Sequence, residues 1–182
     1  MKADITAELV NEHKLVLRMI ALLERNAGLT AAGGFSNWQF YLDGVDFIRN
    51  YADRFHHAKE EDVLFAALVR NGMPRDNSPV AAMLMEHDQG REFVRGMETA
   101  VQEMLAGAAG RENSIAENAL AYASLLREHI AKEDDILYPL AERVIPEVIR
   151  EEILDGYRQA GTKSDADFSE RYRKLVETYE QE

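Results

Sequence analysis

Two histidine and glutamate pairs carry the clearest chemical signal in this sequence. His56 and Glu60 lie four residues apart, as do His129 and Glu133, within the similar segments HHAKEEDVLF and HIAKEDDILY. A spacing of four residues places both side chains on one helix face, one turn apart. Two such helices facing each other would bring two carboxylates and two imidazoles together. Each carboxylate could then bridge a pair of cations.

The remaining histidines follow the same repeat. His13 and His87 each come directly after a glutamate, at corresponding positions of the two halves of the chain. Either one alone could be an ordinary core histidine satisfied by hydrogen bonds, but four inward histidines at repeated offsets favour a common site. The repeat predicts a duplicated helical hairpin whose two copies contribute the same polar residue types to the middle of a bundle.

The absence of cysteine limits the chemistry of such a site. Any metal must be held by nitrogen and oxygen, a ligand set that suits iron, manganese or zinc. Burying two unpaired carboxylates would cost several kcal/mol each, and cations would offset that cost. Five histidines and two bridging carboxylates supply about nine of the roughly twelve positions that two six-coordinate ions need. An oxo or hydroxo bridge would take two more, leaving one position open for a small molecule.

Two assignments stay open at this stage. His57 lies about 100° around the helix from His56, so surface exposure competes with ligation. Glu61 pairs with His57 as Glu60 pairs with His56, and one of the two glutamates is expected to be solvated.

Other acidic residues near the motifs have simpler interpretations. Asp134 and Asp135 are most simply a solvated face. Glu12, Glu86 and Glu128 precede histidines and are predicted to be surface groups or groups that support a ligand from behind, because adjacent helical positions do not share a face.

Apolar spacing predicts the helices that must position these residues. The first helix is expected at about residues 5–26 with Asp4 as its cap. The second is expected to start at a Ser36 cap and to end at Gly72 and Pro74.

A second pair of long helices follows. Ser78 and Pro79 are typical of a cap followed by proline at the first helical position. Ser114 and Glu117 form a capping-box pattern for the fourth helix, which Pro139 should bend or end. The predicted buried stripe of the fourth helix contains Tyr122, Leu125, Leu126, His129, Glu133, Ile136 and Leu140.

The last part of the chain is also predicted to be helical. A short helix is expected around Ile153, a loop at Gly161 to Ser164, and a final amphipathic helix beyond Phe168. The fold predicted is therefore all-α: an antiparallel up-and-down four-helix bundle over residues 1–145, with a helical extension over 146–182. The extension is expected to pack on the bundle or to serve self-association as a homodimer.

Composition excludes several functions. The net charge of -12 leaves no basic face for phosphate neutralisation, so nucleic acid and an anionic membrane surface are not expected partners. The first residues contain no apolar signal core, and no stretch approaches the roughly 20 apolar residues that span a bilayer. We therefore expect a cytoplasmic protein.

The motifs HHAKEEDVLF and HIAKEDDILYP, with the EH dipeptides at 12–13 and 86–87, resemble those of the hemerythrin-like HHE cation-binding domains. The resemblance covers about residues 5–145. It implies a di-iron centre with His13, His56, Glu60, His87, His129 and Glu133 as ligands and the glutamates bridging. Some members carry a further ligand directly after the first histidine of that motif, which would make His57 the fifth imidazole.

The resemblance also limits the function. Oxygen-carrying hemerythrins place two histidines one turn apart on the third helix. Here the residue one turn after His87 is Arg91. The leading hypothesis is therefore a non-heme di-iron protein that binds or reacts with dioxygen, peroxide or nitric oxide. A sensor or binding module without turnover is the alternative, and a zinc or manganese hydrolase is less well supported. Tyr51 and Tyr122 are expected as ordinary core residues, with lining of the pocket or metal ligation as the alternatives.

Overall fold

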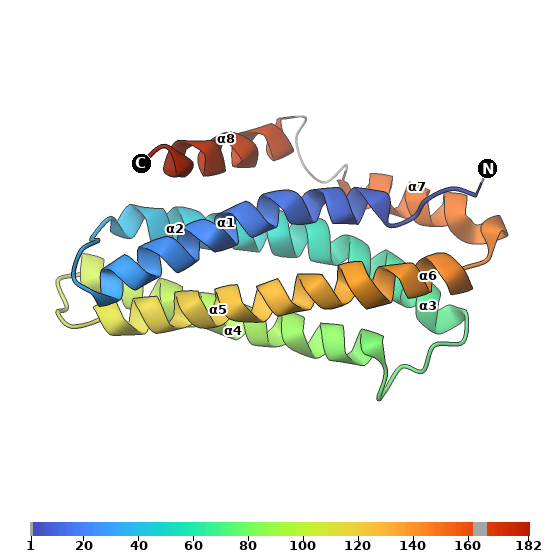
Figure 1. Ribbon diagram of the computed structural model, residues 1–182, viewed down its shortest axis with the longest axis horizontal. Helices are drawn as coiled ribbons and strands as arrows, with labels where there is room; N and C mark the ends of the chain where they lie inside the picture. The colour runs from blue at the N-terminus through green and yellow to red at the C-terminus, as the bar shows by residue number, and fades with distance from the viewer. Residues whose placement is uncertain (1, 162–166) are drawn as a thin grey trace.

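The computed structural model describes residues 2–161 and 167–182, and all regular structure in these ranges is helical. The predicted all-α class is confirmed. Four long helical segments lie side by side in Figure 1, followed by two shorter helices.

The first long segment is α1, Ala7–Ala31. The N-cap residue is Thr6, whose side chain makes no capping hydrogen bond, so the predicted Asp4 cap is wrong in position. Asp4 Oδ1 nevertheless accepts hydrogen bonds from the backbone N–H groups of Thr6 and Ala7, at 3.0 and 2.9 Å. The helix continues past the predicted end at about residue 26 and includes Gly28.

The second long segment is built from α2 (Trp38–Phe47), η1 (Ile48–His57), η2 (Glu60–Phe65) and α3 (Ala66–Arg70). Its cap is Asn37, whose side chain accepts from the Phe40 N–H at 3.2 Å, and the predicted Ser36 cap is wrong. The segment ends where predicted, because Gly72 adopts a φ of 98° that favours glycine.

The third long segment is α4, Pro79–Leu105. Ser78 Oγ accepts from the Ala81 N–H at 3.2 Å, and Pro79 occupies the first turn, so the predicted start is confirmed. Gly107, with a φ of 93°, follows its end.

The fourth long segment comprises α5 (Glu112–Lys132), η3 (Glu133–Leu137) and α6 (Tyr138–Val144). It begins before Ser114, and no side chain caps it, so the predicted capping box is wrong. Pro139 does not end it. Proline removes one backbone donor, and the wider turn of η3 directly before it accommodates that loss.

The segments η2 and η3 occupy corresponding positions of the repeat and start at Glu60 and Glu133. Both are π-helical, with more residues per turn than an α-helix, so the residues that follow are rotated relative to an α-helical pattern. The predicted burial of Ile136 is wrong for this reason. It is 59% exposed, while Leu137 and Tyr138 are buried.

The packing splits the core into two apolar clusters with the histidine and glutamate residues between them. α5 packs along both α1 and α4, and α2 packs against α4. Along α1, Leu9 belongs to the smaller cluster and Val16 to the larger one, with His13 between them. Along α4, Met83 and Val94 bracket His87 in the same way.

The C-terminal part contains η4 (Glu147–Ile149), α7 (Arg150–Gly161) and α8 (Phe168–Glu180). Most of the loop predicted at Gly161 to Ser164 lies outside the described residues. The final helix lies beside α1 (Figure 1), and its buried aromatic residues join the larger cluster. Tyr172 Oη donates to Asp46 at 2.7 Å and Tyr179 Oη donates to Asp43 at 2.5 Å.

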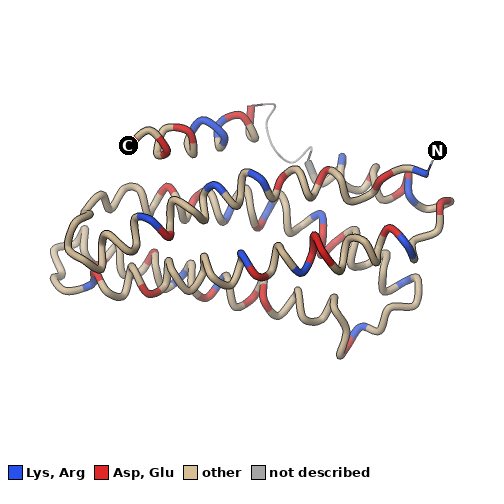
Figure 2. The backbone as a smooth tube through the Cα atoms, in the orientation of Figure 1, with Lys and Arg blue, Asp and Glu red and all other residues tan. Residues whose placement is uncertain are grey.

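The surface mixes both signs of charge. Figure 2 shows acidic and basic residues interspersed along the helices. Across the described ranges, every helix is too short or too polar to cross a bilayer.

Candidate metal centre

The four long segments bring all five histidines and two glutamates to one level of the molecule. The side chains come from α1 (His13), η1 (His56, His57), η2 (Glu60), α4 (His87), α5 (His129) and η3 (Glu133). All seven are buried, and none is more than 6% exposed. Residues far apart in the sequence thus form one polar cluster between two apolar ones.

The glutamates lie between the imidazoles. Glu133 Oε1 is 3.2 Å from His129 Nε2, and Oε2 of the same carboxylate is 3.3 Å from His13 Nε2. Glu60 Oε2 is 3.5 Å from His87 Nε2 and 3.8 Å from His56 Nε2. Each carboxylate therefore reaches histidines from two different helices.

Four of the histidines contact a carboxylate through Nδ1, the ring nitrogen on the side away from the centre. The Nδ1 partners are Asp134 for His13 at 2.8 Å, Glu12 for His56 at 2.9 Å, Glu61 for His87 at 2.7 Å and Glu86 for His129 at 2.9 Å. A carboxylate accepts, so Nδ1 carries a proton, and whenever the ring is neutral its Nε2 lone pair is then available to a metal at the centre.

With neutral rings protonated at Nδ1, this arrangement places acceptors against acceptors. His87 Nε2 and His129 Nε2 are only 3.0 Å apart. Within the described residues, Glu60 Oε2 and both carboxylate oxygens of Glu133 are buried without a hydrogen-bond partner. Converging lone pairs at buried positions are unfavourable unless a cation lies among them. The donor set therefore fits a metal.

The pKa values of the buried groups shift in different directions. Burial opposes the charged forms of His13 and His129, but the carboxylates beside each ring outweigh it, raising the pKa of His13 to about 9 and that of His129 above its usual value. A metal that binds at these two rings must therefore displace a proton.

Burial and the neighbouring Glu133 carboxylate raise the pKa of Glu60 well above its usual value. Burial also opposes ionisation of Glu133, but the imidazoles of His129 and His13 outweigh it and lower the pKa of Glu133. Burial lowers the pKa of His56 and His57, which favours neutral, ligand-ready rings.

Two sets of ligand atoms are close enough for a metal ion each. His57, Glu60, His87 and His129 form one set, the three-histidine group. His13, His56, Glu60 and Glu133 form the other, the two-histidine group. In each set all ligand atoms lie within 4.8 Å of one another, and Glu60 belongs to both.

Comparison with known families agrees with this geometry. The family model of the hemerythrin HHE cation binding domain matches residues 4–141, most of the chain. The chain belongs to this family. Neither the curated proteins nor the solved structures gave a significant match. The matched range contains every residue of both groups.

In this hemerythrin HHE domain, Glu60 and Glu61 have different surroundings. Glu60 is fully buried and belongs to both groups, whereas Glu61 Oε1 accepts from His87 Nδ1 and from Arg91 at 2.8 Å. Asp134 is not merely solvated as predicted, because it supports His13. Glu128 is exposed.

Sequence reasoning missed two lysines behind the centre. Lys59 is 1% exposed and its Nζ donates to Glu12, and also to Glu8 at 2.6 Å. Lys132, at the corresponding position of the repeat, donates to Glu86. Each lysine neutralises the carboxylate that supports a histidine. The lysine shared by both motifs, in HHAKEE and HIAKED, was the available signal.

Sequence reasoning also missed Tyr138. Its hydroxyl donates to Glu60 Oε1 at 2.5 Å and lies 3.4 Å from His13 Nε2. The corresponding residue of the first repeat is Phe65. The signal was therefore a difference between the repeats, a phenol in place of a phenyl ring.

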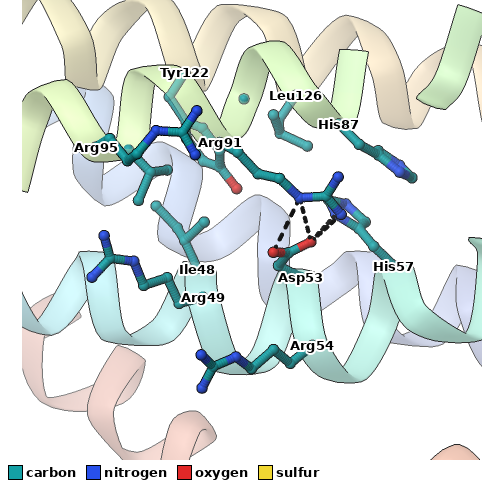
Figure 3. A pocket seen from close by; sticks show the side chains of 12 residues that line it. Ile48, Arg49, Asp53, Arg54, His57, His87, Arg91, Arg95, Tyr122 and Leu126 are labelled. Atoms are coloured by element: carbon teal, nitrogen blue, oxygen red, sulfur yellow. Dashed lines mark hydrogen bonds and ion pairs between the residues drawn. The ribbon is translucent and has the colours of Figure 1, made fainter. Parts of the chain in front are cut away.

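Arg91, one turn after His87 on α4, supports the centre through two carboxylates. Its guanidinium donates to Asp53, with the shortest distance 2.6 Å, and to Glu61. Asp53 lies 3.4 Å from His57 Nδ1, and Glu61 holds His87. Figure 3 shows Arg91 reaching across to Asp53 beside His57.

Proposed function

We propose that this hemerythrin HHE domain holds two iron ions and reacts with a small molecule such as dioxygen, peroxide or nitric oxide. Iron would supply one-electron redox chemistry and an open coordination position. Zinc and manganese also suit the ligand types. The observation that carries the proposal is the pair of buried carboxylates whose partnerless oxygens lie among the lone pairs of histidines.

The residues have distinct roles in this proposal. Glu60 and Glu133 would each contribute to holding both ions, because each carboxylate lies between histidines of different helices. The histidines ligate through Nε2 while their Nδ1 protons stay on the carboxylates behind them. His57 is the fifth imidazole and belongs to one side of the centre only.

A fold proposal accompanies the function. Residues 1–145 form an antiparallel up-and-down bundle from a duplicated hairpin, and residues 146–182 are an extension packed on it. Support comes from the repeated pairs of contacts: Glu12 with Lys59 recurs as Glu86 with Lys132.

The proposal is tested by anaerobic titration of metal-free protein with ferrous iron. The wild type should bind close to two ions per chain, and Glu133→Ala should lose tight binding because a ligating carboxylate is removed. Glu128→Ala is the matched control, since it removes an exposed glutamate from the same segment. Equal iron binding by all three proteins would contradict the proposal.

Turnover separates a catalyst from a carrier or sensor. After iron loading, peroxide or nitric oxide should be consumed many times per centre if the protein is a catalyst. Stoichiometric consumption would favour the sensor alternative.

One observation favours that alternative. Phe55, next to His56, lies 5.2 Å from Phe168 of α8 between ring centroids, and Tyr51 stacks on the same ring at 6.2 Å. A shift of η1 on metal oxidation would therefore reach the final helix. Hydrogen exchange of α8 should differ between reduced and oxidised protein if the sensor function holds, and should be identical if it does not.

A further inference from the structure

A cavity of about 210 Å³ lies beside the three-histidine group, between η1, α4 and α5 (Figure 3). Its lining includes the exposed residues Arg54 and Arg95 and the buried residues His57 and His87. It therefore runs from the surface to two histidines of the centre.

The cavity is larger than a diatomic ligand needs. A cavity of about 150 Å³ lined by apolar side chains is enough to hold benzene, and one water occupies about 30 Å³ in the liquid. A molecule of about six to ten non-hydrogen atoms would fill this space. Ile48, Val94 and Leu126 provide buried apolar walls for such a molecule.

One wall carries a buried donor that has nothing to bind. Tyr122 is 2% exposed, and its hydroxyl has no hydrogen-bond partner in the part of the chain that the structure describes. In Figure 3 its oxygen points from α5 into the space between Ile48 and Arg91. Burial raises the pKa of Tyr122, so its hydroxyl stays protonated. The hydroxyl can donate its proton to an acceptor that enters the cavity, and its oxygen can accept a hydrogen bond.

The charge of the lining selects the kind of acceptor. Arg49, Arg54, Arg91 and Arg95 line the cavity together with one carboxylate, Asp53. Three of these arginines are already paired with carboxylates: Arg49 with Glu98, Arg91 with Asp53 and Glu61, and Arg95 with Glu92. Arg54, exposed at the opening, instead contacts the neutral side chain of Asn50, so its positive charge attracts an anion into the opening.

We propose that this cavity binds a small organic carboxylate, with an aromatic or branched apolar body, as a substrate or effector held next to the metal centre. The carboxylate accepts a hydrogen bond from Tyr122 Oη, and the apolar body lies against Ile48, Val94 and Leu126. The role as substrate or effector rests on the proposed function, whereas the binding itself does not require it.

Calorimetry of the metal-loaded protein with benzoate tests the proposal. Benzoate should bind saturably, one molecule per chain, and the neutral isostere benzamide should bind at least tenfold more weakly. Absence of benzoate binding, or equal binding of benzamide, would overturn the proposal.

Variants locate the site. Tyr122→Phe should weaken benzoate binding by about tenfold or more, because a hydrogen bond to a charged group is lost. Tyr157→Phe is the matched control, since it removes an equally buried and unpartnered hydroxyl outside the cavity. Arg54→Gln should weaken binding by a few-fold at low salt, and Arg143→Gln, an exposed arginine elsewhere, should not. Equal affinities for Tyr122→Phe and Tyr157→Phe would overturn the proposal.

Two further measurements distinguish binding in the cavity from binding of iron at the centre. The fluorine resonance of bound 4-fluorobenzoate should shift in the wild type and not in a Leu126→Trp variant that fills the cavity. Iron content determined on the same samples separates the two ideas. Two irons without benzoate binding would overturn the cavity alone, and Tyr122-dependent binding without iron would overturn the proposed function alone.

Discussion

The two halves of the centre share a framework and differ most at two positions. In both, a glutamate backed by a lysine holds one histidine, and a further carboxylate holds a second histidine. The three-histidine group adds His57, where the second repeat has Ile130, and it borders the cavity. The two-histidine group instead has Tyr138 beside it, where the first repeat has Phe65.

In the proposed two-ion centre, this difference would make the two metal positions unequal. The repeated residues fix the imidazoles and carboxylates, and the differing residues decide which side is open. In the proposed function, small molecules react at the three-histidine side, because that side meets the cavity, while the two-histidine side is closed by Tyr138.

The largest effect is expected from a substitution of Glu60, which both groups share. Glu60→Ala should abolish tight binding of both ions, because Glu60 belongs to both groups. Elemental analysis after anaerobic iron loading measures this loss. Glu61→Gln should retain both ions with weaker affinity, since Glu61 only supports His87. The reverse order of the two variants would exchange the roles of the two glutamates.

The next largest effect is expected from a substitution that changes the three-histidine group only. His57→Ile makes the first repeat like the second at this position and removes a ligand from the three-histidine group. Affinity for one of the two ions should fall by about tenfold or more, with the other retained. Stepwise iron titration followed by spectroscopy distinguishes the two binding events. Parallel weakening of both would contradict separate positions.

Supporting carboxylates should differ between the halves in stability. Glu12→Gln and Glu86→Gln should each lower metal affinity by about 10- to 100-fold. Glu12→Gln should in addition destabilise the fold by about 1–3 kcal/mol, because it weakens the partner of a buried lysine. Lys132 is 38% exposed at its side chain, so water can replace Glu86. Urea unfolding of both metal-free variants measures the difference, and equal losses would contradict it.

The smallest effect is expected from Tyr138→Phe, which makes the second repeat like the first. Both ions should be retained, and stability should change by no more than about 1.5 kcal/mol, the range for one hydrogen bond. Thermal unfolding and iron content measure this. Loss of an ion would show that Tyr138 is itself required for binding.

The inward placement of the candidate ligand residues was predictable from sequence because the repeat marks them twice. His56 with Glu60 and His129 with Glu133 fall on inward faces in the structure, as their spacing indicates. The residues behind them were harder to assign. Asp134 and Lys59 look like ordinary surface residues in sequence, and only the contact of different helices gives them partners.

The errors in the fold, and the features that sequence reasoning missed, have separate physical origins. The stripe through Ile136 assumed α-helical periodicity, which the π-helical turn after Glu133 interrupts. The Ser114 cap was a local pattern, whereas the helix already begins at Glu112. The cavity required the packing of three segments, and the free hydroxyl of Tyr122 was invisible in a stripe of buried residues.

The most direct measurement is the metal content of the protein purified without added metal, together with its visible spectrum before and after reduction. We predict close to two irons per chain and an absorption band that a reductant removes. Zinc alone, or no metal even after anaerobic iron loading, would contradict a redox-active iron pair at these histidines and glutamates.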